Sequence, residues 1–236
     1  MEFDKKERLT VEYDPDKIVT NCHIIDIADL ENVDQNSYIL QDIMPYYKTK
    51  AQKIQSRKKS LAELGVGVLL ARVLNITTNE AIMIDEYGKP FLADEKSEIG
   101  ISHAGNLVLL ATSNGSIGVD VEPLPDSLSA YHYYALKKVY GNQLSDIVEC
   151  EKDLTPYVFC KLWTQAEAAV KLDGRGLRLD PVEHLHVISE VYFCTYEYKK
   201  HIITVATYEV GEVAMKEQKW MINRAATTDA VEVKGG

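Results

Sequence analysis

Two acidic side chains separated by one residue are the first feature of this chain that could do chemistry. Asp120 and Glu122 lie in the apolar segment 117–122. Alternate side chains of an extended segment share one face, so we expect both carboxylates to point the same way while Val119 and Val121 enter the core. Carboxylates this close repel each other, and oxygen ligands suit a hard cation such as Mg²⁺. Taken alone, the pair also fits a solvated edge strand.

A second pair of charged residues lies on a predicted helix over residues 155–172. Glu167 and Lys171 are four residues apart, which places them next to each other on one helix face. They border an apolar stripe that includes Trp163, and Gly174 is typical of a helix C-cap. Taken alone, the pair also fits a surface ion pair, which would stabilise the fold by only about 0.3–0.5 kcal/mol.

A cationic stretch precedes both pairs. Between residues 48 and 59 there are six basic side chains and no acid: Lys48, Lys50, Lys53, Arg57, Lys58 and Lys59. Such a run can be a solvated helix face. The whole chain carries a formal charge of −10, however, so a local anion site is the alternative that this stretch leaves open.

The composition narrows the class of protein. The chain has 236 residues, 46% of them hydrophobic and 26% charged, as in ordinary globular proteins. Its negative charge argues against nucleic-acid binding, and no apolar run approaches the roughly 20 residues that cross a membrane. The charged first residues lack the apolar core of a signal peptide, and the four cysteines lie far apart. We therefore expect a cytoplasmic protein with reduced thiols.

The order of predicted elements indicates an α+β fold. Helices are expected at 60–74, 129–140, 143–150 and 155–172, and an amphipathic segment at 33–44 ends at Pro45. Strands are expected at 22–27, 82–84, 107–111, 117–122, 185–188, 191–198 and 202–210. Gly65 and Gly67 lie inside the first helix, which favours close packing there. The order predicts two similar halves, 18–115 and 116–212, with peripheral tails at 1–17 and 221–236.

Together these motifs resemble the 4′-phosphopantetheinyl transferase family, in its two-repeat, surfactin-synthetase-activating (Sfp-like) type. The resemblance covers residues 88–177 and extends more faintly to about 45 and 210. The matching motifs are Gly88-Lys89-Pro90, Ser102-His103, Gly118-Val119-Asp120-Val121-Glu122, the segment from Trp163 to Lys171 with Glu167 inside it, and Gly174-Arg175-Gly176-Leu177. Each motif is weak alone, but their order and spacing together are specific.

The resemblance implies a fold and a reaction. The fold is a pseudo-twofold pair of α+β halves with the active site at their interface. Such enzymes move the 4′-phosphopantetheine arm of coenzyme A to a serine of an apo acyl or peptidyl carrier protein and release 3′,5′-ADP. Asp120, Glu122 and Glu167 match the family's ligands for Mg²⁺, for which Mn²⁺ is an alternative. Glu167 is the expected base for the serine, directly or through a water. Lys171 is expected to neutralise the charge of the leaving phosphate. The expected catalytic residues are therefore Glu167, Lys171 and Asp120.

The resemblance also implies a binding site for coenzyme A, which is a co-substrate. The residues that match it are Lys48, Lys59, Ser60, Lys89, Pro90, Ser102, His103 and Lys171. The family also has phosphate-binding lysines upstream, to which Lys48 or Lys50 corresponds. The spacing in this chain is shorter than usual, so the sequence does not decide between the two.

One position departs from the family pattern. Ala166 stands where the family usually has a lysine, on the apolar stripe of the predicted helix. The chain keeps both halves of the site, so we expect an active monomer. The alternative is a non-catalytic protein that binds coenzyme A or a nucleotide and has kept the fold. The carrier protein and its pathway do not follow from the sequence.

Overall fold

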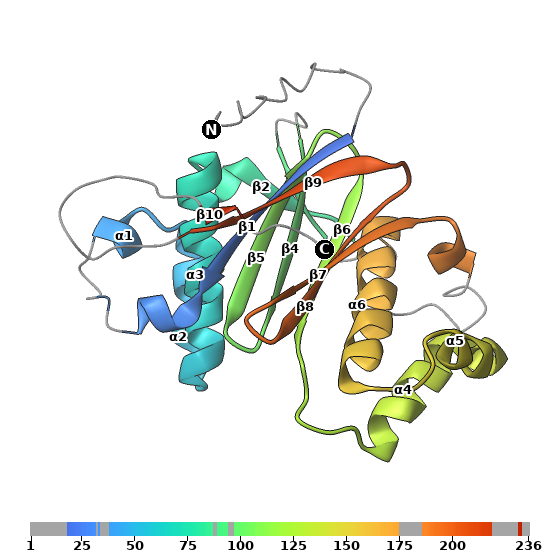
Figure 1. Cartoon of the computed structure of the whole chain (residues 1–236). Coiled ribbons are helices and arrows are strands. Elements are labelled where there is room, and N and C mark those ends of the chain that lie inside the picture. Colours follow the sequence, from blue (N-terminus) through green and yellow to red (C-terminus); the bar gives the residue numbers. More distant parts are fainter. Residues whose placement is uncertain are drawn as a thin grey trace, which may run out of the picture.

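The computed structural model describes residues 18–31, 33, 38–86, 89–93, 97–174, 186–218 and 231–232. Helices and strands are mixed along the chain, so the α+β class is confirmed. Helix α3 covers one sheet and helix α6 covers another, with the two sheets packed between them (Figure 1). The tail 1–17, the turn residues Tyr87 and Gly88, and most of 221–236 lie outside the described residues.

The larger sheet has five strands in the order β10-β9-β1-β5-β4. Strand β5 is buried on both faces and pairs with β1 and β4, both antiparallel. Strand β9 pairs parallel to β1, which joins the C-terminal part of the described chain to its first strand. The bounds are β1 Ile18–Asp26, β4 Glu98–Ala104, β5 Leu107–Ser113, β9 Gly211–Glu217 and β10 Val231–Glu232.

The second sheet has three antiparallel strands in the order β6-β8-β7. Its strands are β6 Ile117–Pro123, β7 Tyr192–Tyr198 and β8 His201–Thr207, and a separate hairpin is formed by β2 Ile82–Ile84 and β3 Pro90–Leu92. Alternate residues of β5 face α3 and β6, so Leu107, Leu109 and Ala111 pack with Val119 and Val121 between the two sheets. Both valines are at most 1% exposed, which confirms the predicted orientation of β6.

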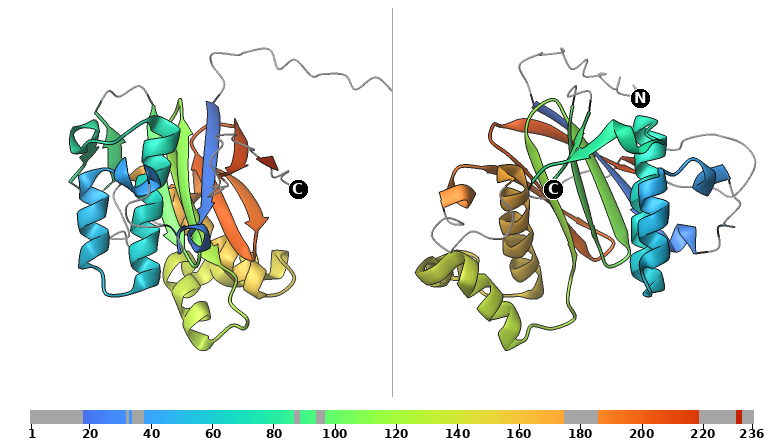
Figure 2. Two further views of the ribbon diagram at one scale, coloured as in Figure 1. Left: turned by 90° about the vertical axis from the view of Figure 1, so that its left-hand side faces the viewer. Right: turned by 180° about the vertical axis from the view of Figure 1, so that it is seen from behind.

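The helices lie on the outer faces of these sheets. Figure 2 shows α2 and α3 side by side against the larger sheet, while α4 and α5 lie near α6 on the other side. They are α1 Tyr38–Gln41, α2 Pro45–Lys53, α3 Arg57–Leu74, α4 Ala130–Tyr140, α5 Leu144–Cys150 and α6 Pro156–Asp173, with single 3₁₀ turns at Ile27–Leu30, Asn79–Ala81 and Gly141–Gln143.

Local signals set the ends of the two longest helices. The Ser56 hydroxyl accepts a hydrogen bond from the Lys59 amide at the start of α3, and Thr155 does the same for Val158 in α6. Gly174 ends α6 with φ +84°, a left-handed conformation that glycine adopts without strain. Pro45, expected to end a helix, is instead the first residue of α2, where a missing N–H costs nothing.

The predicted strand at 185–188 is wrong. Residues 186–189 form one helical turn, and residue 185 lies outside the described part. Four residues with two apolar side chains are too few for their spacing to separate a strand from a turn of helix. The other predicted strands are present; the ends of the strand at 82–84 are as predicted and those of the others are shifted.

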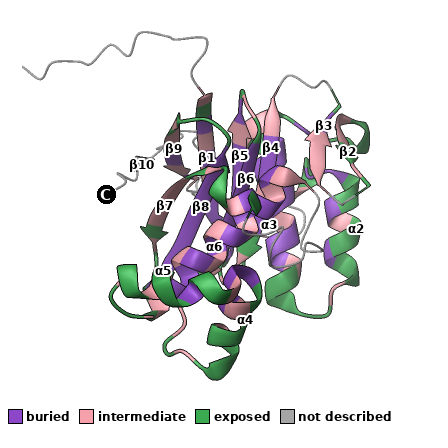
Figure 3. Ribbon diagram, turned by 90° about the vertical axis from the view of Figure 1, so that its right-hand side faces the viewer, coloured by how far each residue is buried: buried purple, intermediate pink, exposed green. Residues whose placement is uncertain are grey.

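The glycines within α3 allow the close packing that the sequence predicts. A Cβ at Gly65 would lie 3.0 Å from Val108 Cγ2, and one at Gly67 would overlap Ile43 Cγ2. Buried residues concentrate in the strands and on the inner side of α6, while α4 and α5 expose most of their surface (Figure 3). All four cysteines carry free thiols. Within the described ranges, no helix combines the length and apolar character needed to cross a membrane.

Candidate active site

Helix α6 approaches β6 more closely than any side chain on Gly118 would allow. A Cβ at Gly118 would overlap the backbone oxygen of Ala168 and the backbone nitrogen of Leu172. Beside it, Gly100 of β4 faces Val119, whose Cγ2 would lie 2.9 Å from an added Cβ. These two glycines let β4, β6 and α6 meet, and the candidate site lies where they do.

A polar triad joins these three elements. Lys171 Nζ of α6 lies 2.6 Å from Asp120 Oδ1 of β6, and it donates to Ser102 Oγ of β4 at 3.1 Å. The Ser102 hydroxyl in turn donates to Asp120 Oδ1 at 2.9 Å. Asp120 is 3% exposed, so these hydrogen bonds offset the cost of burying its charge. Three motifs that lie far apart in the sequence therefore meet at one carboxylate.

Glu122 and Glu167 lie beside this triad, and with Asp120 they form what we call the acidic edge. The pKa of Glu122 is raised to about 7, chiefly by burial and then by the charges of Asp120 and Glu167, against the opposing effect of Lys171. Burial, followed by the charge of Asp120, likewise raises the pKa of Glu167 to about 7. A hydrogen bond from Trp163 partly stabilises the charged form of Glu122.

The acidic edge has the donor chemistry of a Mg²⁺ site. All three of its side chains offer carboxylate oxygens, and Asp120 Oδ2 is buried with no hydrogen-bond partner among the described residues. As they are placed, however, the described side chains include no group of three or more His, Cys, Asp or Glu close enough to hold a metal. The residue types fit a hard cation, and binding one through all three carboxylates would require these side chains to come closer together.

A basic pocket lies next to the triad. Its lining comes from α2, from the β2–β3 hairpin, from β4 and from α6: Tyr46, Tyr47, Lys50, Ile84, Pro90, Ile101, Ser102, His103 and Lys171. Four of the eight residues assigned to coenzyme A, Pro90, Ser102, His103 and Lys171, thus line one pocket. Burial lowers the pKa of His103, as do Lys50 and Lys171, while Glu63 raises it.

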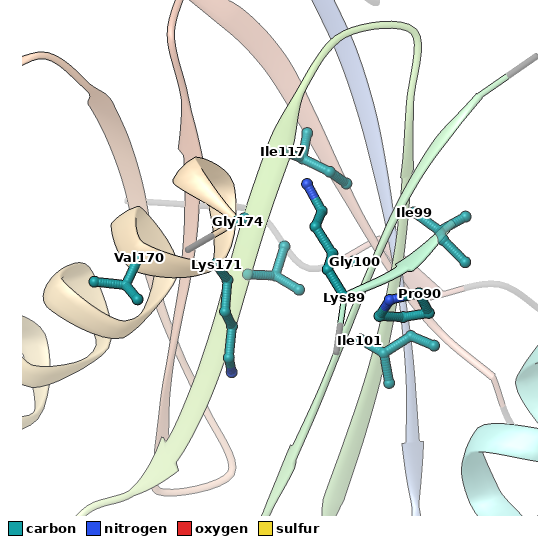
Figure 4. Close-up of a pocket in the computed structure, with 11 residues that line it drawn as sticks. Lys89, Pro90, Ile99, Gly100, Ile101, Ile117, Val170, Lys171 and Gly174 are labelled. Carbon is teal, nitrogen blue, oxygen red and sulfur yellow. The ribbon is translucent and has the colours of Figure 1, made fainter. Parts of the chain in front are cut away.

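A second, more apolar pocket shares Lys171, Pro90 and Ile101 with the first. Figure 4 shows Lys89 and Pro90, together with Ile99 and Ile101 of β4, on one side of it and Val170 and Lys171 of α6 on the other. Lys89 Nζ also lies 3.6 Å from Glu98 Oε2. Lys89 therefore lies close to the other coenzyme candidates without lining the basic pocket.

Three other candidates are not brought to the basic pocket. Lys48 Nζ donates to the backbone oxygen of Gln41 at 2.6 Å, and Ser60 Oγ donates to that of Ala51 at 2.9 Å. Lys59 is exposed at the start of α3. Of the two upstream lysines left open by the sequence, Lys50 rather than Lys48 faces the pocket. Gly88 and the Arg175-Gly176-Leu177 part of the last motif lie outside the described residues.

Two further observations concern residues near the site. Ala166 is 3% exposed and packs in the core between α4, α6 and β8, so an apolar residue is well accommodated there. Glu63, which the sequence analysis missed, is buried on α3 with its Oε1 2.9 Å from Lys50 Nζ. An acid within the apolar run 61–71 was the only signal that could have identified it.

Fold and site together define an α+β protein in which an acidic edge meets a basic pocket. No protein-family model matches the chain. Curated relatives do match it. It is 36% identical to the 4′-phosphopantetheinyl transferase ffp of Bacillus subtilis over 96 residues, which is 40% of this chain and 41% of the relative.

Two further relatives match longer segments. The chain is 27% identical to the 4′-phosphopantetheinyl transferase Sfp of Bacillus subtilis strain 168 over 153 residues, or 62% of this chain and 66% of that protein. It is 32% identical to the 4′-phosphopantetheinyl transferase gsp of Aneurinibacillus migulanus over 121 residues, or 50% and 48%. The matches thus span between 41% and 66% of these relatives' lengths. They support membership of the Sfp-like 4′-phosphopantetheinyl transferase family.

Proposed function

We propose that this chain transfers the 4′-phosphopantetheine group of coenzyme A to a serine of an apo acyl or peptidyl carrier protein and releases 3′,5′-ADP. The observation that carries the proposal is the Ser102–Asp120–Lys171 triad, which connects an acidic edge to a pocket lined by cations. This transfer needs both regions, since it gathers phosphate charge and must also deprotonate a hydroxyl.

The basic pocket is proposed to hold the phosphates of coenzyme A. His103 and Lys50 supply donors on two of its walls, and Lys171 supplies a third cation from α6. Ser102 orients Lys171 by accepting a hydrogen bond from it. Lys89 and Pro90 bind a neighbouring part of the same molecule, while Lys59, Ser60 and Lys48 would contact it only after a change in side-chain position.

Glu167 is proposed to accept the proton of the carrier serine. A base acts best when its pKa is close to the working pH, and the pKa of Glu167 is raised to about 7. The serine oxygen then forms a bond to the pantetheine-bearing phosphorus, and the P–O bond of the pyrophosphate breaks. Lys171, one helical turn later, donates to the phosphate that leaves with 3′,5′-ADP. Asp120 holds Lys171 in place for this role.

Asp120, Glu122 and Glu167 are proposed to hold Mg²⁺, with Mn²⁺ as an alternative. The bound cation would supply charge neutralisation at the pyrophosphate. The raised pKa values of both glutamates and the unpartnered Asp120 Oδ2 support this assignment, because each reports carboxylate charge that a cation would stabilise.

We further propose that 18–115 and 116–212 are related by a pseudo-twofold axis, with the site at their interface. In support, each half contributes three strands in the same spatial order, β1-β5-β4 and β6-β8-β7. In both, the strand that comes last in the sequence lies between the other two. A single chain then supplies both halves of the site, so we expect an active cytosolic monomer. Activity that falls on dilution, together with a trimer by light scattering, would contradict this expectation.

The proposal is tested by incubating the protein with coenzyme A, Mg²⁺ and a set of apo acyl and peptidyl carrier proteins. The expected result is a gain in carrier mass equal to one phosphopantetheine, lost when the carrier serine is replaced by alanine or when the metal is chelated. Tight binding of coenzyme A with no gain in mass on any carrier would favour the non-catalytic alternative.

A further inference from the structure

Helix α3 carries one buried carboxylate within a face that is otherwise apolar. Glu63 is 5% exposed, while its helix neighbours Ala62 and Val66 lie in the core. Its Oε1 lies 2.9 Å from Lys50 Nζ and 3.7 Å from His103 Nε2. Its Oε2 is buried and accepts no hydrogen bond from the part of the chain that the structure describes.

The two basic side chains that contact Glu63 come from different walls of the basic pocket. Lys50 belongs to α2 and His103 to β4, and both line the pocket, whereas Glu63 lies behind them. Helices α2 and α3 pack side by side, which brings the α2 wall within reach of the Glu63 side chain (Figure 2). One carboxylate thus connects two walls that are distant in sequence.

Burial at this position is costly unless the charge is paired. Both contacts of Glu63 are to Oε1, so the buried and unpartnered Oε2 leaves part of the desolvation cost uncompensated. An apolar residue would serve the packing of α3 better, so packing does not explain a glutamate here. The ion pair with Glu63 restricts Lys50, whose part-exposed side chain would otherwise sample several rotamers.

The opposite side of the pocket has the same arrangement. There Asp120, 3% exposed, holds Lys171 at 2.6 Å. Two buried carboxylates on two different elements therefore each hold one lysine at the edge of the same pocket. Cations ordered before the ligand arrives bind an anion at a lower entropic cost.

We propose that Glu63 is a positioning residue that holds Lys50 and His103 in place for the phosphate groups of coenzyme A. This inference rests on the proposed function of the pocket. It differs from a role in folding alone, which would change stability without changing affinity. It also differs from a role as a competing counter-ion, because removing a competitor would tighten binding.

The test compares Glu63→Gln with the native protein by calorimetric titration with coenzyme A, without metal or carrier. Glutamine keeps the shape but weakens the hold on Lys50 and His103, so the dissociation constant for coenzyme A is expected to rise about 3- to 10-fold. In turnover assays the KM for coenzyme A should rise by the same factor, with kcat within about twofold. The matched control is Glu151→Gln, which removes a 2.7 Å ion pair with Lys161 outside the pocket and should change neither constant.

A double mutant separates positioning from general charge effects. If Glu63 acts through Lys50, adding Glu63→Gln to Lys50→Gln should weaken binding by less than about twofold more. Glu63→Asp retains the charge but withdraws it from Lys50, and it provides the same comparison should the glutamine variant fold poorly. Melting temperatures of all variants identify losses caused by unfolding.

Unchanged or tighter binding of coenzyme A by folded Glu63→Gln and Glu63→Asp would overturn the inference while leaving the proposed function intact. A native protein that binds coenzyme A but modifies no carrier would overturn the proposed transfer, and the Glu63 comparison would still decide the inference. A native protein that binds no coenzyme A would overturn both.

Discussion

Carboxylates gather on one side of the junction between β4 and β6, and cations gather on the other. The acidic edge contains Asp120, Glu122 and Glu167, with Lys171 as the cation that offsets them. The basic pocket contains Lys50, His103 and Lys171, with Glu63 as the buried acid behind them. In each region, one buried carboxylate holds one lysine.

The two regions differ in what remains after that pairing. In the acidic edge the charges left over are negative and part-buried, and their raised pKa values record the cost. In the basic pocket both lysines, Lys50 and Lys171, line a space open to a ligand. A cation bound at the acidic edge together with a polyphosphate bound in the basic pocket would compensate the charges of both regions, as the proposed reaction requires.

The largest expected effect comes from separating the two regions. Gly118→Ala should cost about 3 kcal/mol or more of stability, since the new methyl group would overlap backbone atoms of α6 that cannot move independently. Gly100→Ala is the matched control, because its Cβ would meet only the Val119 side chain. Chemical denaturation measures both, and equal costs would mean that the contact between α6 and β6 is not what fixes the site.

The sequence predicted the faces on which the residues of the acidic edge lie, because these faces follow local periodicity. The alternation along β6 and the four-residue spacing on α6 place Asp120, Glu122, Glu167 and Lys171 correctly on their faces, whatever the rest of the chain does. The contact between Asp120 and Ser102 depends on tertiary packing, and the sequence did not predict it.

The basic pocket was less predictable for a physical reason. Which of Lys48 and Lys50 faces the pocket depends on the rotation of α2, and Pro45 begins that helix rather than ending another. Glu63 looked like one polar residue in an apolar helix, and its partners lie 13 residues before it and 40 after it in the chain. Long-range pairing of this kind leaves no periodic signal.

The next effect tests the acidic edge alone. Glu167→Gln should leave the fold intact and lower the turnover of carrier modification by at least about 10²-fold, because it removes the proposed base together with one ligand charge. Binding of coenzyme A in the absence of metal should change little, since the basic pocket remains.

The measurement pairs single-turnover transfer with calorimetric binding. Near-normal transfer by Glu167→Gln would show that the two regions do not divide the work as proposed. The adjacent Gln165→Ala, at a part-buried position on the same helix, is a control that should retain activity.

A smaller effect concerns the stability of the metal-free protein. Glu122 has a folded pKa raised to about 7 from its ordinary value of 4.5, so the protonated carboxyl favours the folded state. The folded state binds more protons between these values, and stability is therefore lost as the pH rises from about 4.5 to 7. Glu122→Gln should add about 1 kcal/mol at pH ~8, a value reduced for solvent screening of a part-exposed group.

Thermal melts across this pH range check the prediction. The gain from Glu122→Gln should shrink towards zero near pH ~4.5, and Mg²⁺ should stabilise the native protein more than the variant. A gain that is the same at every pH would mean that charge repulsion at the acidic edge does not limit stability.

The smallest expected effect on catalysis is at Ala166, the position where the family usually has a lysine. Successive helix residues point about 100° apart, so a lysine here cannot take the place of Lys171. The site is 3% exposed and packed against the core, so Ala166→Lys must crowd its neighbours or extend its amine to solvent, at a cost of about 1–3 kcal/mol in stability.

The rate of carrier modification per folded molecule of Ala166→Lys should change by less than about tenfold, or about 1.4 kcal/mol in activation free energy. Ala166→Met adds similar bulk without charge, so carrier modification by both variants at saturating coenzyme A and Mg²⁺ separates the two effects. An inactive native protein made active by Ala166→Lys, but not by Ala166→Met, would mean that the acidic edge lacks a necessary cation and that this chain has lost the reaction.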